Sequence, residues 1–163
     1  MLRPVLLPTE IAGRLWLHSM PGRREPLEQA WEQIRLDGVE VIVCLAPSEE
    51  VHANSPSYAG ALDAKAVPCR VESFPIPDYG VPNDREAFWS LAMKIAGQLK
   101  AGGRVLIHCG AGIGRTGTLA KCVLLALDEP ATSAWQAVSK AGSSPETAEQ
   151  KELVAWCALR AGK

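Results

Sequence analysis

The sequence predicts an α/β domain in which a short central sheet of about four or five strands carries helices on both faces. Three observations support this fold class. Strand and helix patterns alternate along the chain, residues 39–45 form a nearly unbroken apolar run, and residues 88–99 repeat apolar side chains at helical spacing. An unbroken apolar strand is typical of a sheet that is covered on both faces. No repeat or linker divides the 163 residues, so we expect one domain over 1–163.

The first half of the chain supplies the first expected elements in order. Apolar patterns predict strands at 15–18, 39–45 and 67–74, with helices at 27–37 and 57–63. Gly38 is placed to end the first helix, since glycine readily adopts the left-handed conformation of a helix C-terminus. Pro68 lacks a backbone donor, which predicts that the strand at 67–74 lies at an edge of the sheet.

The second half alternates in the same way. Residues 75–82 contain three prolines and read as a loop, after which Asn83 and Glu86 form a plausible capping box for a long helix. A strand is expected at 105–107, followed by helices at about 115–127, 130–140 and 145–159. Ser143 or Ser144 is the expected cap of the last helix, with Pro145 in its first turn.

Composition excludes several classes of function. The net charge is −1 without a long charged run, which argues against nucleic acid or an anionic membrane as the main partner. Five cysteines, an odd number without a Cys-x-x-Cys pair, argue against a disulfide framework and a zinc site. Residues 1–17 lack the apolar core of a signal peptide, and no run is long enough to span a bilayer. We therefore expect a cytoplasmic protein without metal or cofactor.

The stretch 104–118 carries the chemistry. A strand leads into Cys109, glycines follow at 110, 112 and 114, and Arg115 opens a helix. Glycines allow successive amide groups to point inward, and the helix N-terminus adds donors and partial positive charge. The planar guanidinium of Arg115 matches two phosphate oxygens. This loop therefore predicts a site for a tetrahedral dianion, with Cys109 at its floor as an ionised nucleophile aimed at phosphorus.

The string His108-Cys-Gly-Ala-Gly-Ile-Gly-Arg-Thr-Gly117 resembles the signature His-Cys-x-Ala-Gly-x-Gly-Arg-[Ser/Thr]-Gly of protein tyrosine and dual-specificity phosphatases. The wider layout resembles bacterial dual-specificity-like enzymes and the cyclin-dependent-kinase-associated phosphatase group. The resemblance implies the three-layer sandwich of that family and a cysteinyl-phosphate intermediate. It implies that the Thr116 hydroxyl stabilises the Cys109 sulfur as it leaves the intermediate, and that His108 supports Cys109 through hydrogen bonding. The substrate-binding loop would comprise Gly110, Ala111, Gly112, Ile113, Gly114 and Arg115.

The family also needs a general acid on an upstream loop. Residues 74–82 offer Asp78, which would protonate the leaving group and then act as base toward water. An aspartate beside glycine and proline is also ordinary turn chemistry. Asp84 is the alternative acid, although it is expected at the start of the following helix.

Three further expectations concern residues around the loop. The string Glu146-Thr-Ala-Glu-Gln150 resembles the family segment that positions the hydrolytic water, with Gln150 matching and Glu146 departing from the pattern. Cys44 ends a central strand and is either a small buried hydrophobe or a redox partner of Cys109. Arg23 and Arg24 either extend a basic rim or are solvated surface charges.

The expected substrate is a phosphate monoester, most directly phosphotyrosine in a protein, with dual specificity toward phosphoserine and phosphothreonine. The loop has Gly110 and Ile113 where phosphoinositide-specific relatives often carry lysines, which disfavours but leaves open an inositol phosphate or another small molecule. Two alternative hypotheses remain: a phosphate-binding module without catalysis, and a rhodanese-type sulfur transferase. The joint presence of Cys109, Arg115 and Asp78 disfavours the binding module, and the upstream loop with Asp78 disfavours the sulfur transferase.

Overall fold

The computed structural model describes all 163 residues and contains a five-stranded sheet with the strand order β1-β2-β5-β3-β4. The strands are β1 Arg3–Val5, β2 Arg14–His18, β3 Val41–Cys44, β4 Arg70–Ser73 and β5 Arg104–His108. Strand β1 pairs with β2 in the antiparallel direction, and all other neighbours are parallel. The predicted sheet is confirmed, and β4 occupies an edge as the position of Pro68 indicates.

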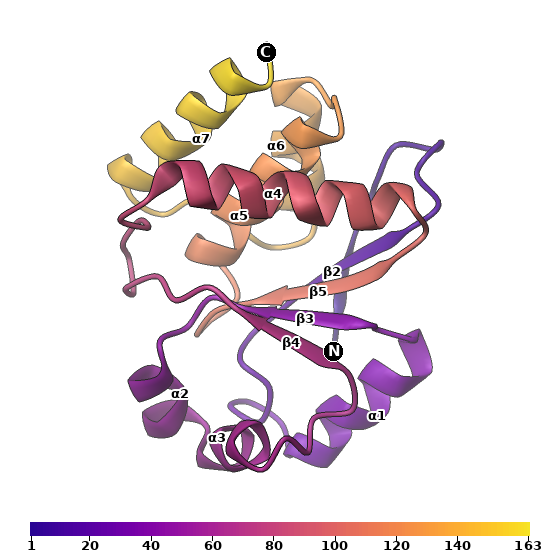
Figure 1. Ribbon diagram of the computed structural model, residues 1–163, viewed down its shortest axis with the longest axis vertical. Helices are drawn as coiled ribbons and strands as arrows, with labels where there is room; N and C mark the ends of the chain where they lie inside the picture. Colours follow the sequence, from indigo (N-terminus) through magenta and orange to yellow (C-terminus); the bar gives the residue numbers. More distant parts are fainter.

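Seven helices cover the sheet in two layers (Figure 1). They are α1 Leu27–Asp37, α2 Ser48–Asn54, α3 Pro56–Asp63, α4 Arg85–Lys100, α5 Gly114–Ala126, α6 Ala131–Lys140 and α7 Ala148–Arg160. Helices α1, α2 and α3 lie on one face, whereas α4 to α7 lie on the other. The expected three-layer α/β sandwich is therefore confirmed. No helix combines the length and the apolar character needed to cross a membrane.

Side chains that alternate along the central strands belong to two separate hydrophobic cores. In β3, Val41 and Val43 join the core under α4 to α7, while Ile42 and Cys44 join the core over α1 to α3. Side chains of successive strand residues point to opposite faces, so one apolar run serves both layers. This arrangement explains why β3 is apolar at every position.

The parallel strands place their carboxyl ends at one edge of the sheet. In the register, Cys44 of β3 and His18 of β2 both stand beside His108 of β5. Ligand sites of open α/β sheets form outside this edge. The loop that follows β5 therefore lies between the segments that follow β2 and β3.

Two elements were not expected from the sequence. Strand β1 is only three residues long and contains Pro4, so its pattern is too short to be recognised without its partner β2. Helix α2 lacks a side-chain cap and buries only Val51. Strand β4 is shorter than expected because pairing with β3 begins at Arg70, after Pro68.

Helix termini confirm one prediction and correct two. Gly38 ends α1 in the left-handed conformation with φ 67°, as expected. The cap of α4 is Asp84, whose carboxylate accepts from the Ala87 amide, and not Asn83 with Glu86. Helix α7 begins after Thr147, which forms a capping box with Gln150, so the expected start at Pro145 with a serine cap is wrong. Both corrections are local shifts, because the competing polar residues lie within a few positions of each other.

Candidate active site

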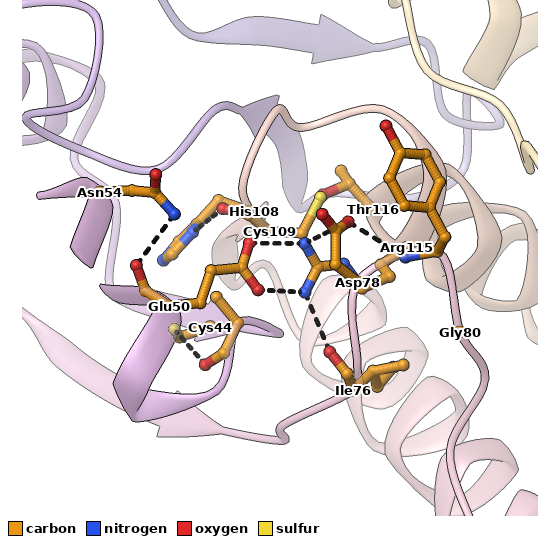
Figure 2. Close-up of polar contacts among 12 residues, drawn as sticks. Cys44, Glu50, Asn54, Ile76, Asp78, Gly80, His108, Cys109, Arg115 and Thr116 are labelled. Carbon is orange, nitrogen blue, oxygen red and sulfur yellow. Dashed lines mark hydrogen bonds and ion pairs between the residues drawn. The ribbon is translucent and has the colours of Figure 1, made fainter. Parts of the chain in front are cut away.

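The loop between β5 and α5 curls around Cys109, which is buried at the end of the strand (Figure 2). Its carbonyl groups are held on the outside of the curve. The Cys109 carbonyl accepts from His108 Nδ1 at 2.9 Å, the Gly110 carbonyl from the Met20 amide at 3.0 Å, and the Ile113 carbonyl from the Gly117 amide at 2.8 Å. In a planar trans peptide the N–H points opposite to the C=O. The amides that follow these carbonyls therefore face the inside of the loop.

The inward amides form a set of free donors. No protein atom accepts a hydrogen bond from the amides of residues 110–113. Helix α5 begins at Gly114 and adds its N-terminal amides and partial positive charge to the same concave surface. Consecutive inward amides at a helix N-terminus are a common binding site for phosphate and similar anions.

The sulfur of Cys109 has one side-chain partner in the loop. The Thr116 hydroxyl donates a hydrogen bond to the Cys109 Sγ across 3.1 Å, and Thr116 is itself fully buried. Thr116 belongs to the first turn of α5, so the start of this helix is tied to the sulfur. The predicted pairing of these two residues is present in the geometry.

Arg115 is the most heavily bonded side chain of the site, with 2% of its side chain exposed. It forms a two-point ion pair with Glu50, in which Nη1 and Nη2 each donate to a different carboxylate oxygen at 2.8 Å. Nη1 also donates to the Ile76 carbonyl at 2.9 Å, and Nη2 to Asp78 Oδ1 at 3.0 Å. Burial acts to lower the pKa of the Arg115 guanidinium, but the hydrogen bonds of Glu50 and attraction to Cys109, Glu50 and Asp78 together raise that pKa.

The contacts of Arg115 bring Asp78 into the site from the loop after β4. The segment between the end of β4 and Asp78 is anchored to β3 and the residue after it, because the amides of Phe74 and Ile76 donate to the carbonyls of Cys44 and Leu45 at 2.9 Å. The Asp78 side chain remains 60% exposed, unlike the buried guanidinium that it contacts. It is therefore free to leave Arg115 without disturbing the core. Asp84, the alternative acid, is occupied as the cap of α4.

His108 lies behind the loop in a fixed orientation. Its Nδ1 bonds to the Cys109 carbonyl, which can only accept, so Nδ1 carries the proton and Nε2 accepts from the Tyr58 hydroxyl at 2.9 Å. Full burial lowers the pKa of His108 to about 4, so the ring is neutral near pH 7. His108 therefore links Tyr58 to the start of the loop.

Gln150 and Glu146 flank the point where the loop becomes α5. The Gln150 side chain accepts from the Glu146 and Thr147 amides at 2.7 and 3.3 Å and donates to the Gly80 carbonyl at 3.2 Å. A side chain at Gly114 would meet the Glu146 carboxylate and the Gln150 amide oxygen. Gln150 thus joins α7 to the loop that bears Asp78.

Cys44 lies beside β5 on the sheet, adjacent to the Tyr58 hydroxyl. Its thiol donates weakly to the Ala46 carbonyl across 3.6 Å, and burial raises the pKa of this thiol to about 11. A protonated thiol is a poor nucleophile near neutral pH. In this state Cys44 packs as a small apolar side chain.

The two neighbouring arginines of the β2–α1 connection point to different places. A Cβ added to Gly110 would meet Nη1 of Arg23 at 3.0 Å and Nη2 of Arg115 at 3.3 Å, so Arg23 lies at the mouth of the loop. Arg24 instead lines a cavity of about 410 Å³ to which Ala111 and Ile113 of the loop also contribute. Arg23 therefore lies beside Arg115, whereas Arg24 lies beside Ala111 and Ile113.

The sequence did not identify Glu50 or Tyr58 as parts of the site. Glu50 lies in the first turn of α2, six residues after the end of β3, the strand next to β5. An acidic residue near that sheet edge is the signal that could have indicated it. Tyr58 resembles an ordinary core residue in the sequence. No group of three or more His, Cys, Asp and Glu side chains is arranged to hold a metal ion.

The chain is similar in sequence and in fold to known proteins. Within the chain, 46 residues are 46% identical to the human receptor-type tyrosine-protein phosphatase H, and 55 residues are 42% identical to the rat cyclin-dependent kinase inhibitor 3. These segments cover 26% and 34% of this chain and only 4% and 26% of the two relatives. A crystal structure of kinase-associated phosphatase with its catalytic cysteine replaced by serine superposes with a TM-score of 0.81 at 19% identity, covering 99% of this chain and 96% of that one.

A family model extends the match to nearly the whole chain. The model described as the Swiss Army Knife protein, DSP-PTPase phosphatase domain, matches residues 12–160. That range runs from the start of β2 to the end of α7 and includes the loop, Glu50 and Asp78. Signature, fold and arrangement of the site therefore agree that the chain belongs to this family of cysteine-dependent dual-specificity and tyrosine phosphatase domains.

Proposed function

We propose that this protein hydrolyses phosphate monoesters through a cysteinyl-phosphate intermediate, with phosphotyrosine in proteins as the main substrate and phosphoserine or phosphothreonine as further ones. One observation carries the proposal. Arg115 holds Asp78 at 3.0 Å from one side of a loop whose floor is Cys109, hydrogen-bonded to Thr116. A nucleophile, an oxyanion ligand and an acid thus meet around one ring of inward amides.

In the first step, the Cys109 thiolate attacks phosphorus while the inward amides and Arg115 hold the non-bridging oxygens. The bond from phosphorus to the ester oxygen breaks, and Asp78 gives its proton to that oxygen. Because Arg115 uses one Nη2 hydrogen on Asp78, a phosphate that binds the guanidinium competes with this ion pair. Substrate binding therefore releases the exposed aspartate toward the leaving group.

In the second step, Asp78 takes a proton from water as the water oxygen attacks the phosphocysteine. The phosphorus–sulfur bond breaks, inorganic phosphate leaves, and the thiolate returns to its hydrogen bond with Thr116. Gln150 is our candidate for orienting this water, since its amide lies beside Gly114 at the start of α5. Donors positioned at a leaving sulfur lower the barrier for its departure.

The proposal is tested with purified protein and two aryl phosphates of different leaving-group strength. Cys109→Ser should abolish turnover of p-nitrophenyl phosphate while the protein still binds inorganic oxyanions. Asp78→Ala should lower kcat on phenyl phosphate by about 100- to 10,000-fold but much less on p-nitrophenyl phosphate. Asp84→Ala is the matched control and should leave the dependence on the leaving group unchanged. Substantial turnover by Cys109→Ser contradicts the thiolate mechanism, and an equal loss on both esters in Asp78→Ala contradicts the assignment of the acid.

Substrate class is tested on the same preparation. Phosphotyrosine peptides should be hydrolysed with a higher kcat/KM than phosphoserine peptides or inositol phosphates. A preference for inositol phosphates would move the protein to the small-molecule class. Absence of turnover on all of these esters would leave a phosphate-binding module.

A further inference from the structure

The outermost bend of the catalytic loop is fixed by side chains from outside the signature. Gly112 has φ +76°, and a Cβ there would collide with the His18 carbonyl, so the bend is pressed against the end of β2. Its carbonyl oxygen accepts two hydrogen bonds of 2.6 Å, one from Arg3 Nη2 and one from the Ser143 hydroxyl. Few backbone oxygens in the chain are held by two such short side-chain bonds.

Arg3 connects three parts of the fold. Besides Gly112, its Nη1 donates to the Ala141 carbonyl at 2.7 Å and to the Ser143 hydroxyl at 3.2 Å. The guanidinium therefore joins β1 to the α6–α7 connection and to the catalytic loop. None of these partners is a carboxylate, so the positive charge of Arg3 is not neutralised by the bonds that hold it. Burial lowers the pKa of Arg3, and attraction to the Cys109 sulfur opposes that change.

The contact with Gly112 controls one of the inward amides. The Gly112 carbonyl and the Ile113 N–H belong to one planar trans peptide and point in opposite directions. A carbonyl held outward by Arg3 therefore turns the Ile113 amide toward the inside of the loop. Glycine at this position gives the backbone several alternative conformations, so an external restraint has a large effect on which one is populated.

We propose that Arg3 is a positioning residue for oxyanion binding, which holds the Gly112–Ile113 peptide so that the Ile113 amide faces the substrate phosphate. The inference rests on the proposed function. It goes beyond that function because Arg3 lies outside the signature and outside residues 12–160 that match the family model. Ser143 shares the task, since its hydroxyl donates to the same carbonyl.

The experiment compares Arg3→Met, Ser143→Ala and the double variant with the wild type. Tungstate affinity is measured by calorimetry. The values of kcat and KM are measured with p-nitrophenyl phosphate, and stability is measured by thermal unfolding. Arg3→Met should weaken tungstate binding by about tenfold, the loss expected for one charge-assisted hydrogen bond. Ser143→Ala should weaken it by about threefold. The double variant should lose more than the product of the two, because in each single variant the remaining donor still partly restrains the shared carbonyl.

Two comparisons separate positioning from a purely structural role. Arg14→Met is the matched control, since Arg14 is an exposed arginine of the adjacent strand β2 without a side-chain hydrogen bond. It should bind tungstate like the wild type. Millimolar methylguanidinium should restore tungstate affinity to Arg3→Met. Arg3→Lys, which keeps the charge but not the fork, should fall between wild type and Arg3→Met, and it provides the test if Arg3→Met does not fold.

Tungstate affinity of Arg3→Met within twofold of Arg14→Met overturns the proposal. A loss that methylguanidinium does not restore, or two single losses that simply multiply in the double variant, also overturns it. Because tungstate binding does not depend on turnover, the two proposals fail separately. A wild type that binds tungstate but hydrolyses no ester would contradict the proposed function and leave the role of Arg3 intact.

Discussion

The Glu50–Arg115 ion pair offers a sharp test of how the site works. Glu50→Gln removes the negative charge but keeps the size and shape of the side chain. The amide oxygen of glutamine can accept from one guanidinium nitrogen, but its NH2 group is a donor and cannot accept from the other. The two-point pair at 2.8 Å therefore becomes a single hydrogen bond. Arg115 then keeps only the Ile76 carbonyl and Asp78 as full partners.

The size of the effect follows from the geometry. Two unit charges about 4 Å apart attract by about 4 kcal/mol at an effective dielectric constant of about 20. The glutamine retains one hydrogen bond, and Glu50 is 16% exposed, so we expect a net loss of about 2 kcal/mol. This corresponds to a fall in kcat/KM of about 30-fold. The fall should appear mainly in kcat. Without Glu50, Arg115 still attracts phosphate but pairs more strongly with Asp78, which then reaches the leaving group less often.

The assay is steady-state hydrolysis of p-nitrophenyl phosphate and phenyl phosphate, with inorganic phosphate as a competitive inhibitor. Glu49→Gln is the matched control, since Glu49 is the exposed neighbour of Glu50 in α2 and has no contact with the loop. Its kcat/KM should equal that of the wild type. If Glu50→Gln stays within threefold of Glu49→Gln, or loses phosphate affinity without losing kcat, the inference that Glu50 holds Arg115 in its active position is refuted.

Three other predictions concern charge, pH and oxidation. Arg23→Ala should raise KM several-fold for phosphopeptides with acidic flanks and not for neutral ones, whereas Arg24→Ala should change neither in the same kinetic assay. His108 is neutral in the fold and its pKa is lowered from 6.5 to about 4, so the unfolded chain binds more protons between these values. The contribution of this residue to the free energy of unfolding is fully present above about pH 6.5 and falls by about 2 to 3 kcal/mol toward pH 4.5. In urea unfolding, the free energy of unfolding of His108→Asn should depend less steeply on pH than that of the wild type. If Cys44 is a redox partner of Cys109, activity lost to peroxide should return with dithiothreitol in the wild type but not in Cys44→Ala; equal recovery would leave Cys44 as a packing residue.

The sequence by itself determined the local chemistry of this protein. The run from His108 to Gly117 contains the proposed nucleophile, the proposed phosphate ligand and the loop glycines within one short segment, so spacing alone predicts their meeting. Apolar periodicity likewise predicted most helices and the central strands. These features depend on neighbours within a few residues, and local patterns record such interactions directly.

Only the tertiary structure decided which distant residues complete the site. Glu50 reaches Arg115 across 65 positions of sequence, and Arg3 reaches Gly112 across 109. Neither has a pattern that distinguishes it from an ordinary surface charge, because its partner is set by the order of strands in the sheet. Pairing β3 with β5 brings the segment with Glu50 to the loop, and pairing β1 with β2, the other neighbour of β5, brings Arg3 to it. The order of the strands cannot be inferred from the residue at a single position. Long-range pairing of this kind is a property of the packed sheet as a whole, so the electrostatic support of the loop emerges only when the fold is assembled.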